Sequence, residues 1–351
     1  MKSVFVDKIA SVAQHSEVSG ELRLSADIPC EEGVLIAVRI LNNKTRYNQL
    51  ELTSGRMATV NQGDIVVGAL GHRNALRGYS GHLPDSLRVG DTVQLLNIGG
   101  VMGICDSANP DVGPPFNGEV LGSVLHFPYL GERIGVPARV GEHRLEPEAP
   151  LDTRGVPVVA LAGTCMDSGK TAAACAIVGR LRHLGFAVAA CKATGVSLRR
   201  DILAMEDAGA RATMIFSDFG IVTTTADNGP ALTRALLSAL AEDQPDVIVL
   251  ELGDGLIGEY GVEAILSDET IRDALTAVIL CANDPVSAWG GARILREQYG
   301  IEPAVVTGPA TDNAVGVRQI RERLSLPAIN ALANGVALGD AIAARLREEK
   351  T

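Results

Sequence analysis

The sequence contains no long hydrophobic run, and its 31 Lys and Arg residues are outnumbered by 42 Asp and Glu residues. None of its apolar stretches approaches the roughly 20 residues that a membrane-spanning helix needs, because Gly, Asp or Arg interrupts each of them. The formal net charge of -11 argues against a nucleic-acid partner, since binding to a phosphate backbone requires clustered Lys and Arg. We therefore expect a small-molecule substrate as the main partner, and neither a nucleic-acid nor a membrane partner.

Closely spaced metal-binding and disulfide motifs are also missing. The six cysteines include no C-x-x-C pair, and the six histidines are scattered along the chain. A chain of 351 residues is large enough to fold without disulfide bonds, so the cysteines are expected to be reduced thiols and a built-in zinc site is not expected. Asp7 and Lys8 interrupt the apolar segment that an N-terminal signal peptide would need. These features predict a cytoplasmic protein.

The first part of the chain, from about residue 18 to residue 144, consists of short apolar runs separated by turn residues. This spacing is typical of β-strands. Two of the runs begin with the same Gly-Asp pair, at Gly63-Asp64 and Gly90-Asp91, which predicts tight turns before strands. We expect residues 1–148 to form a mostly β domain, a small barrel or sandwich, that serves as an accessory or substrate-binding domain.

The pattern changes after a segment at residues 145–157 that carries three prolines. Strands such as VVALAG and VIVLELG then alternate with helical stretches rich in Ala, Leu and Arg. Such alternation is typical of βαβ units, in which helices cover both faces of a parallel sheet. We therefore predict that residues 149–351 form an α/β domain, with its ligand at the carboxyl edge of the sheet.

A phosphate-binding loop follows the first strand of this second domain. The apolar strand VVALAG ends at Gly163, and Gly169-Lys170-Thr171 begins a helix. Backbone N–H groups of such a loop face the phosphates, Lys170 neutralises β and γ oxygens, and the Thr171 hydroxyl ligates Mg²⁺. The predicted nucleotide-binding residues are Gly163, Thr164, Asp167, Ser168, Gly169, Lys170 and Thr171. The predicted cofactors are ATP or GTP, with Mg²⁺.

The loop is one residue longer than the common G-x-x-x-x-G-K-T form, and it resembles the loop of dethiobiotin synthetase and its relatives. That branch of P-loop proteins also includes cobyrinate amidases and molybdopterin-nucleotide and nickel-insertion GTPases. Over roughly residues 156–332 the resemblance implies that Lys192 contacts the transferred phosphoryl group. It further implies that Asp201 and Glu251 join Thr171 as metal ligands, and that the protein is a homodimer.

Alternatives remain open for several of these residues. A lysine that ends a buried strand, as Lys192 does, is also found solvated, and Asp201 at a helix start is also a common cap. Asp254 competes with Glu251 as the metal-binding carboxylate. The stretch Gly253-Asp254-Gly255 departs from the glycine run of the family, and Thr307-Gly308 stands where the family reads adenine. The choice between adenine and guanine is therefore open.

In the β domain, the loop that begins at residue 72 concentrates basic and aromatic side chains. His72, Arg73 and Arg77 form a candidate clamp for a carboxylate or phosphate of the substrate. A solvated loop is the alternative interpretation.

The combined prediction is a Mg-ATP-dependent phosphoryl-transfer enzyme, a ligase or kinase, that acts on a small-molecule acceptor such as a carboxylate or carbamate. Lys170 and Lys192 would be its catalytic residues, acting through position and charge. The alternative is a GTP- or ATP-hydrolysing switch protein that assists the maturation or delivery of a cofactor.

Overall fold

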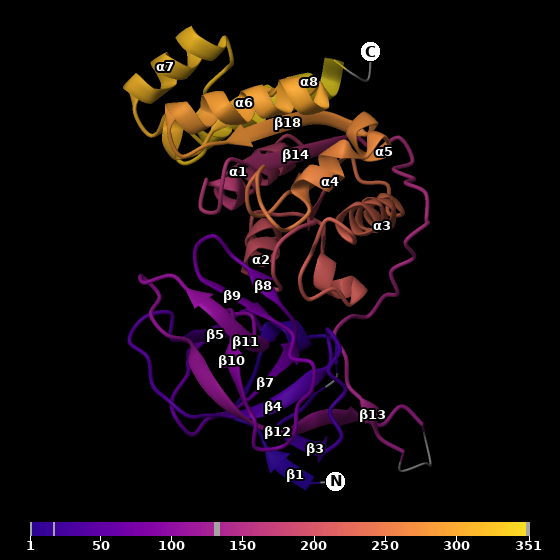
Figure 1. The fold of residues 1–351 in the computed structure, drawn as a ribbon. Coiled ribbons are helices and arrows are strands. Elements are labelled where there is room, and N and C mark those ends of the chain that lie inside the picture. The colour runs from indigo at the N-terminus through magenta and orange to yellow at the C-terminus, as the bar shows by residue number, and fades with distance from the viewer. Residues whose placement is uncertain (1, 17, 130–133, 349–351) are drawn as a thin grey trace. The chain divides into compact units, whose positions relative to one another are not determined.

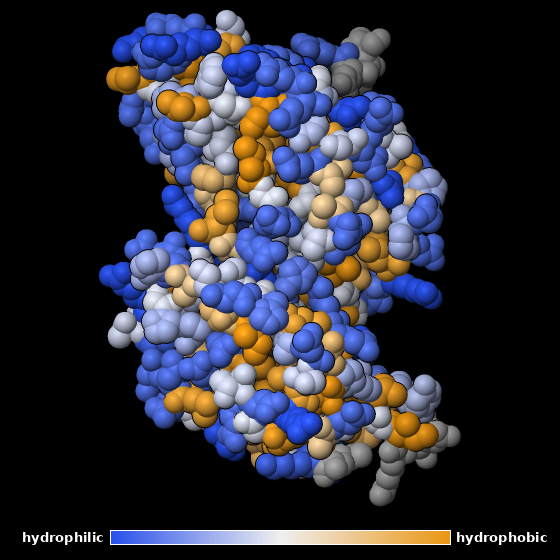
Figure 2. Space-filling model, viewed as in Figure 1, coloured by the Kyte–Doolittle hydropathy of each residue, from blue (hydrophilic) through white to orange (hydrophobic). Residues whose placement is uncertain are grey.

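The computed structural model describes residues 2–16, 18–129 and 134–348 of the chain. The chain forms two compact units. The first unit comprises Met1–Arg144 together with Val196–Arg200 and Phe216–Thr223, and the second comprises the remaining residues. We call them the β unit and the α/β unit. Figure 2 shows mostly hydrophilic side chains on the visible face of each unit, interspersed with smaller apolar groups.

The β unit is built on one large sheet, which is drawn in indigo to magenta in Figure 1. Its strands are β1 (Lys2–Phe5), β2 (Lys8–Ile9), β3 (Glu21–Ser25), β4 (Leu35–Ile40), β7 (Ile65–Leu70), β8 (Arg73–Asn74), β9 (Tyr79–His82), β10 (Thr92–Leu95), β11 (Val101–Ala108), β12 (Phe116–His126) and β13 (Val136–Pro137). A separate hairpin consists of β5 (Gln49–Glu51) and β6 (Met57–Thr59), and a short 3-10 turn, η1, spans Ser11–Ala13.

Five strands of this sheet close into a ring. β12 pairs with β4, β4 with β7, β7 with β11, β11 with β10, and β10 again with β12. Only the contact between β7 and β11 is parallel in this ring. Gly63 and Gly90, with φ of 94° and 97°, adopt the left-handed conformation in the turns before β7 and β10. The predicted mostly β fold, a small barrel or sandwich, is therefore confirmed, and the ring of paired strands is a small barrel.

The α/β unit contains a six-stranded parallel sheet in the order β16-β15-β17-β14-β18-β19. The strands are β14 (Val158–Gly163), β15 (Val188–Lys192), β16 (Ala212–Ile215), β17 (Val247–Glu251), β18 (Leu275–Cys281) and β19 (Val305–Thr307). Every residue of β14, β15 and β17 is buried, as expected for strands covered on both faces. The predicted parallel α/β fold is confirmed.

Eight helices alternate with or follow these strands in the described residues (Figure 1). They are α1 (Lys170–His183), α2 (Arg200–Asp207), α3 (Gly229–Ala241), α4 (Val262–Ser267), α5 (Glu269–Asp273), α6 (Pro285–Tyr299), α7 (Ala314–Leu324) and α8 (Gly335–Glu348), with 3-10 turns η2 (Phe216–Phe219) and η3 (Pro309–Thr311). The helices α1 and α8 pack closely, because a Cβ on Gly339 would lie 2.3 Å from the Cβ of Arg180. No helix in the described part of the chain combines the length and apolar character needed to cross a bilayer.

Two segments from the second half of the sequence complete the β unit. Val222 is fully buried in the apolar core of that unit. The Glu51 carboxylate, which is 0% exposed, accepts hydrogen bonds from the backbone N–H groups of Arg199 at 2.8 Å and Arg200 at 2.7 Å. Glu32 likewise accepts from the N–H groups of Val222 and Thr223. The buried Glu51 and the half-buried Glu32 thus satisfy backbone donors that have no strand partner.

We predict that Glu51→Gln lowers the free energy of unfolding by about 2 kcal/mol, because the amide can satisfy only one of the two buried N–H groups. Chemical denaturation of the full chain measures this loss. Glu119→Gln is the matched control, since Glu119 pairs with Arg39 on the surface and such pairs contribute about 0–1 kcal/mol. Equal losses in the two variants would contradict the role assigned to Glu51.

Candidate functional site

The loop between β14 and α1 has the conformation of a phosphate-binding loop. Asp167 and Gly169 adopt left-handed φ values of 58° and 88°, which turn the chain before α1 begins at Lys170. A Cβ on Gly163 would lie 2.5 Å from Ser168 Oγ and 2.6 Å from Lys170 Nζ. Only glycine at position 163 therefore leaves room for the lysine to fold back over the loop. The first backbone N–H groups of α1 have no helical acceptor, as in an anion-binding helix start.

The ammonium group of Lys170 is buried and is held by main-chain carbonyls. The residue is only 6% exposed, and its Nζ donates to Cys165 O at 2.9 Å and to Asp254 O. Burial lowers the pKa of Lys170, and the nearby Glu251 carboxylate opposes that shift. A cation kept next to the helix start is suited to receive the negative charge of a polyphosphate.

Four of the predicted residues meet at the carboxyl edge of the sheet. Lys192 and Glu251 are direct partners in the register of β15 and β17, and their charged atoms lie 3.9 Å apart. Lys192 also forms an ion pair with Asp201, the second residue of α2. Thr171 donates through Oγ1 to Glu251 Oε1 at 3.2 Å. The structure therefore brings Thr171, Lys192, Asp201 and Glu251 into one cluster.

Glu251 is the most buried member of this cluster. It is 2% exposed, and burial raises its pKa. The positive charge of Lys192 is the largest effect that opposes this rise. Its second oxygen, Oε2, has no hydrogen-bond partner among the described residues. The described residues contain no group of three or more His, Cys, Asp and Glu side chains that would form a complete metal site. An oxygen set of Thr171 and Glu251 fits Mg²⁺, which commonly takes its remaining ligands from phosphates and water.

Asp254 carries three unusual features at once. Its φ of 65° is left-handed, a conformation that costs free energy for any residue with a side chain. It is 8% exposed, and neither carboxylate oxygen forms a hydrogen bond within the described residues. Burial raises its pKa, and Lys170 partly opposes the rise. The sequence pattern marks Asp254 only as a second carboxylate after β17, because backbone strain and burial have no sequence signal there.

A cavity of about 750 Å³ lies beside the loop in the α/β unit. It is lined by residues that follow β18 and β19, namely Asn283, Asp284, Pro285, Pro309, Ala310, Asn313, Ala314, Val315 and Gly316. This wall abuts the phosphate loop, since Asn283 Nδ2 lies 3.2 Å from Cys165 Sγ and a Cβ on Gly308 would lie 2.3 Å from Ser168 O. The sequence indicates Thr307-Gly308 as a departure from the family but gives no signal for Asn283 or the segment after Pro309 as part of this wall.

The three basic residues predicted in the β unit have different surroundings. Arg73 is only 4% exposed, and its guanidinium donates to Tyr47 Oη at 3.0 Å and to Leu96 O. His72 Nδ1 lies 3.5 Å from Glu32 Oε2, whereas Arg77 is exposed. A substrate clamp made of these three side chains stays a prediction.

Comparison with known proteins gives partial structural likeness only. No protein-family model matches the chain, and no curated protein matches it. The signal recognition particle receptor FtsY from Elizabethkingia anophelis is 14% identical, with a TM-score of 0.39 over 53% of this chain and 64% of that chain. A duf1611 family protein from Anabaena variabilis is 11% identical, with a TM-score of 0.41 over 58% and 63%. The hydrogenase maturation factor HypB from Archaeoglobus fulgidus is 15% identical, with a TM-score of 0.39 over 55% and 91%.

Such low scores assign no function to this chain, which spans less than two thirds of the FtsY and duf1611 proteins. The fold follows instead from the coordinates. A parallel sheet, a glycine-bearing loop after its buried strand β14, and a helix that begins at Lys170 give the α/β unit a P-loop fold.

We predict that Asp254→Gly raises the free energy of unfolding by about 1–3 kcal/mol, because glycine relieves the left-handed strain and removes a buried carboxylate. Ser325→Gly is the backbone control, since Ser325 also has a left-handed φ of 55° but is exposed. Chemical denaturation should show a larger gain for Asp254→Gly than for Ser325→Gly. A net loss of stability in Asp254→Gly would mean that the Asp254 carboxylate supports the fold.

Proposed function

We propose that this chain binds a nucleoside triphosphate with Mg²⁺ in the loop before α1 and hydrolyses or transfers its γ-phosphoryl group. The observation that carries this proposal is the convergence of one buried ammonium, one hydroxyl and one buried carboxylate, from Lys170, Thr171 and Glu251, at the start of a helix. A triphosphate supplies the negative charge that this ammonium lacks, because its present hydrogen-bond acceptors are the neutral carbonyls of Cys165 and Asp254 and the Ser168 hydroxyl.

In this proposed mechanism each residue has a distinct role. Lys170 leaves the carbonyls of Cys165 and Asp254 and binds phosphate oxygens. Thr171 and Glu251 hold Mg²⁺, which neutralises phosphate charge when it is bound. Lys192 is already paired with Asp201 and lies near Glu251, so its contribution is to balance and orient these acids. The cavity beside the loop is large enough for a nucleoside. Asn283 Oδ1, which has no hydrogen-bond partner among the described residues, offers one acceptor to the base.

Between the two candidate functions, the contact of Lys170 with Asp254 O favours a nucleotide-hydrolysing switch. When a phosphate binds the Lys170 ammonium, the segment at residues 252–261 loses the hydrogen bond from Lys170 to Asp254 O, which holds the strained Asp254 backbone. The segment contains Gly253, Gly255, Gly258 and Gly261, so its backbone has the freedom to rearrange.

One specific observation supports the ligase or kinase hypothesis. The Asp254 carboxylate is buried, has no hydrogen-bond partner among the described residues, and follows the strand that carries Glu251. A carboxylate in such a place can accept a proton from an attacking acceptor group or water. The G-x-x-x-x-x-G-K-T spacing remains the basis for placing the chain in the dethiobiotin-synthetase-like branch.

Lys170→Ala tests the binding proposal. We expect it to weaken binding of ATP or GTP by at least about 100-fold, because a charge-assisted contact to the phosphates is lost in a buried site. Isothermal titration calorimetry with each nucleotide and Mg²⁺ measures the affinity and reveals the preferred base. Lys2→Ala, at an exposed position of β1, is the control and should bind as the wild type does. Unchanged affinity in Lys170→Ala would refute the phosphate-loop assignment.

Hydrogen exchange tests the switch proposal. We expect amide exchange in residues 252–261 to differ at least about fivefold between a non-hydrolysable triphosphate state and a diphosphate state, which corresponds to a modest coupling free energy. Strand β18 serves as the internal control and should exchange equally in both states, because it lies in the core of the sheet. Identical exchange in residues 252–261, together with phosphorylation of an added carboxylate acceptor, would favour the kinase or ligase.

A further inference from the structure

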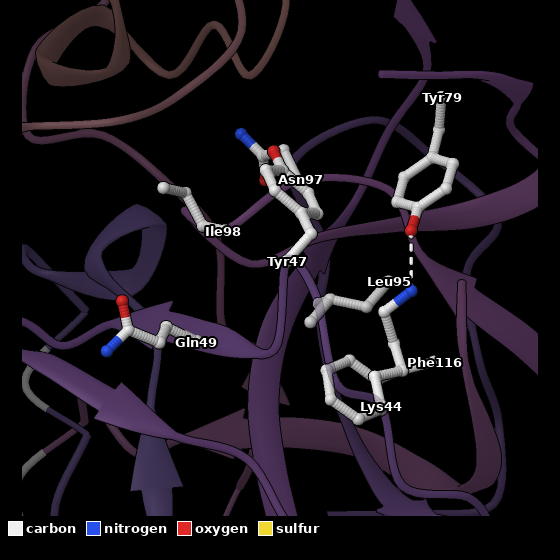
Figure 3. Close-up of a pocket in the computed structure, with 8 residues that line it drawn as sticks. All are labelled: Lys44, Tyr47, Gln49, Tyr79, Leu95, Asn97, Ile98 and Phe116. Carbon is white, nitrogen blue, oxygen red and sulfur yellow. Dashed lines mark hydrogen bonds between the residues drawn. The ribbon is translucent and has the colours of Figure 1, made fainter. Parts of the chain in front are cut away.

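A narrow crevice in the β unit contains one cationic side chain and adjoins a second. Lys44 donates through Nζ to Tyr79 Oη at 2.8 Å, to Val112 O at 3.1 Å and to Pro114 O. Figure 3 shows the Tyr79 hydroxyl directed at the Lys44 ammonium. We call this the Lys44 crevice, and it is lined by Lys44, Tyr47, Gln49, Tyr79, Leu95, Asn97, Ile98 and Phe116. Arg73 adjoins it and donates to Tyr47 Oη at 3.0 Å.

The positive charge of this region has no acidic counterpart in the described residues. Every hydrogen-bond acceptor of Lys44 and Arg73 there is a neutral hydroxyl or carbonyl oxygen, and neither cation lies within 4.0 Å of a carboxylate oxygen. Burial alone lowers the pKa of Lys44, with no acid opposing it. Arg73 is 4% exposed, and its Nε has no hydrogen-bond partner. Burying cations without an anion is costly, so such an arrangement calls for a compensating charge.

Aromatic rings compensate only part of this cost. The Lys44 ammonium lies 5.5 Å from the centroid of the Tyr79 ring and 5.7 Å from that of Phe116. The Arg73 guanidinium lies 5.8 Å from the Tyr47 ring, and the two tyrosine rings meet edge to face at 5.7 Å. Such contacts contribute roughly 0.5–2 kcal/mol each without neutralising the charge. Burial also raises the pKa of Tyr79 to about 12, so its hydroxyl stays protonated and able to donate.

We propose that the Lys44 crevice binds an oxyanion, the carboxylate or phosphate group of a small molecule. The ammonium of Lys44 and the hydroxyls of Tyr47 and Tyr79 are its donors, and Arg73 adds positive charge behind Tyr47. An oxyanion is a stronger partner for an ammonium than a neutral carbonyl is, so it displaces Val112 O and Pro114 O from Lys44. The crevice has no room for even a water molecule in this conformation, so the anion binds only as Val112 O and Pro114 O move away from Lys44. The rest of the ligand stays outside the crevice.

This site is separate in its residues from the phosphate loop, and it differs from the predicted clamp of His72, Arg73 and Arg77. Only Arg73 is shared, and its part here is indirect, through Tyr47. The proposal therefore stands or falls independently of the proposed nucleotide site.

The test measures binding of inorganic phosphate and, in a separate arm, of succinate to the full chain. Calorimetry gives the affinity, and the rise of Tm with anion concentration gives a second readout. We expect Lys44→Met to weaken binding of the preferred anion at least about tenfold, because a charge-assisted hydrogen bond is lost. Arg46→Met is the matched control, since Arg46 is an exposed cation of the same loop that donates only to Asp111 O at 3.4 Å.

Three further outcomes separate the explanations. Tyr79→Phe removes a donor while keeping the ring, so it should also weaken anion binding, and it tests the site if Lys44→Met fails to fold. Lys170→Ala should leave succinate binding unchanged while it abolishes nucleotide binding, which distinguishes this site from the phosphate loop. Absence of binding of both anions to the wild type, or equal affinity in Lys44→Met and Arg46→Met, would overturn the proposal. The anion whose binding Lys44→Met weakens identifies the ligand group as a carboxylate or a phosphate.

Discussion

The buried ammonium of Lys170 is the constraint on which the geometry of the P-loop domain depends. A charge withdrawn from water requires acceptors close by, and here they are the main-chain carbonyls of Cys165 and Asp254. This arrangement requires glycine at position 163, because a Cβ there would collide with Lys170 Nζ. It also places Asp254 in a left-handed backbone conformation. One cation therefore ties the loop after β14 to the segment after β17, and any ligand that captures it changes both.

A second electrostatic balance lies across the neighbouring strands. Lys192 and Glu251 face each other in register, and the ion pair between Lys192 and Asp201 connects β15 to the start of α2. Because both acids lie near one ammonium, removal of that ammonium would remove the ion pair of Asp201 and would leave the buried Glu251 with Lys170 as its remaining positive neighbour. The contact between Lys192 and Glu251 holds Glu251 Oε1 next to Thr171 Oγ1. The charges that stabilise this edge of the sheet therefore also position the oxygens suited to Mg²⁺.

Features governed by local backbone chemistry were predictable from the sequence, whereas those governed by long-range packing were not. The Gly-Asp turns before β7 and β10 and the strand, loop and helix around Lys170 are local patterns, and the fold class they predict is confirmed. The burial of Arg73 has no sequence signal, because a buried and an exposed arginine look alike in a polar loop. The Lys44 crevice was missed because Lys44, Tyr79 and Phe116 come from separate strands and loops.

The β unit is discontinuous in sequence, and this affects how it is made. Its core contains Val222, and its buried Glu51 accepts hydrogen bonds from the N–H groups of Arg199 and Arg200, which are synthesised much later. During synthesis the unit cannot complete its core when residue 144 leaves the ribosome. It must wait for 79 more residues, from 145 to 223, which takes roughly 4–16 s at typical translation rates. Until then part of its apolar core is exposed to solvent. Chaperone binding and aggregation therefore compete with folding of the nascent chain during this period.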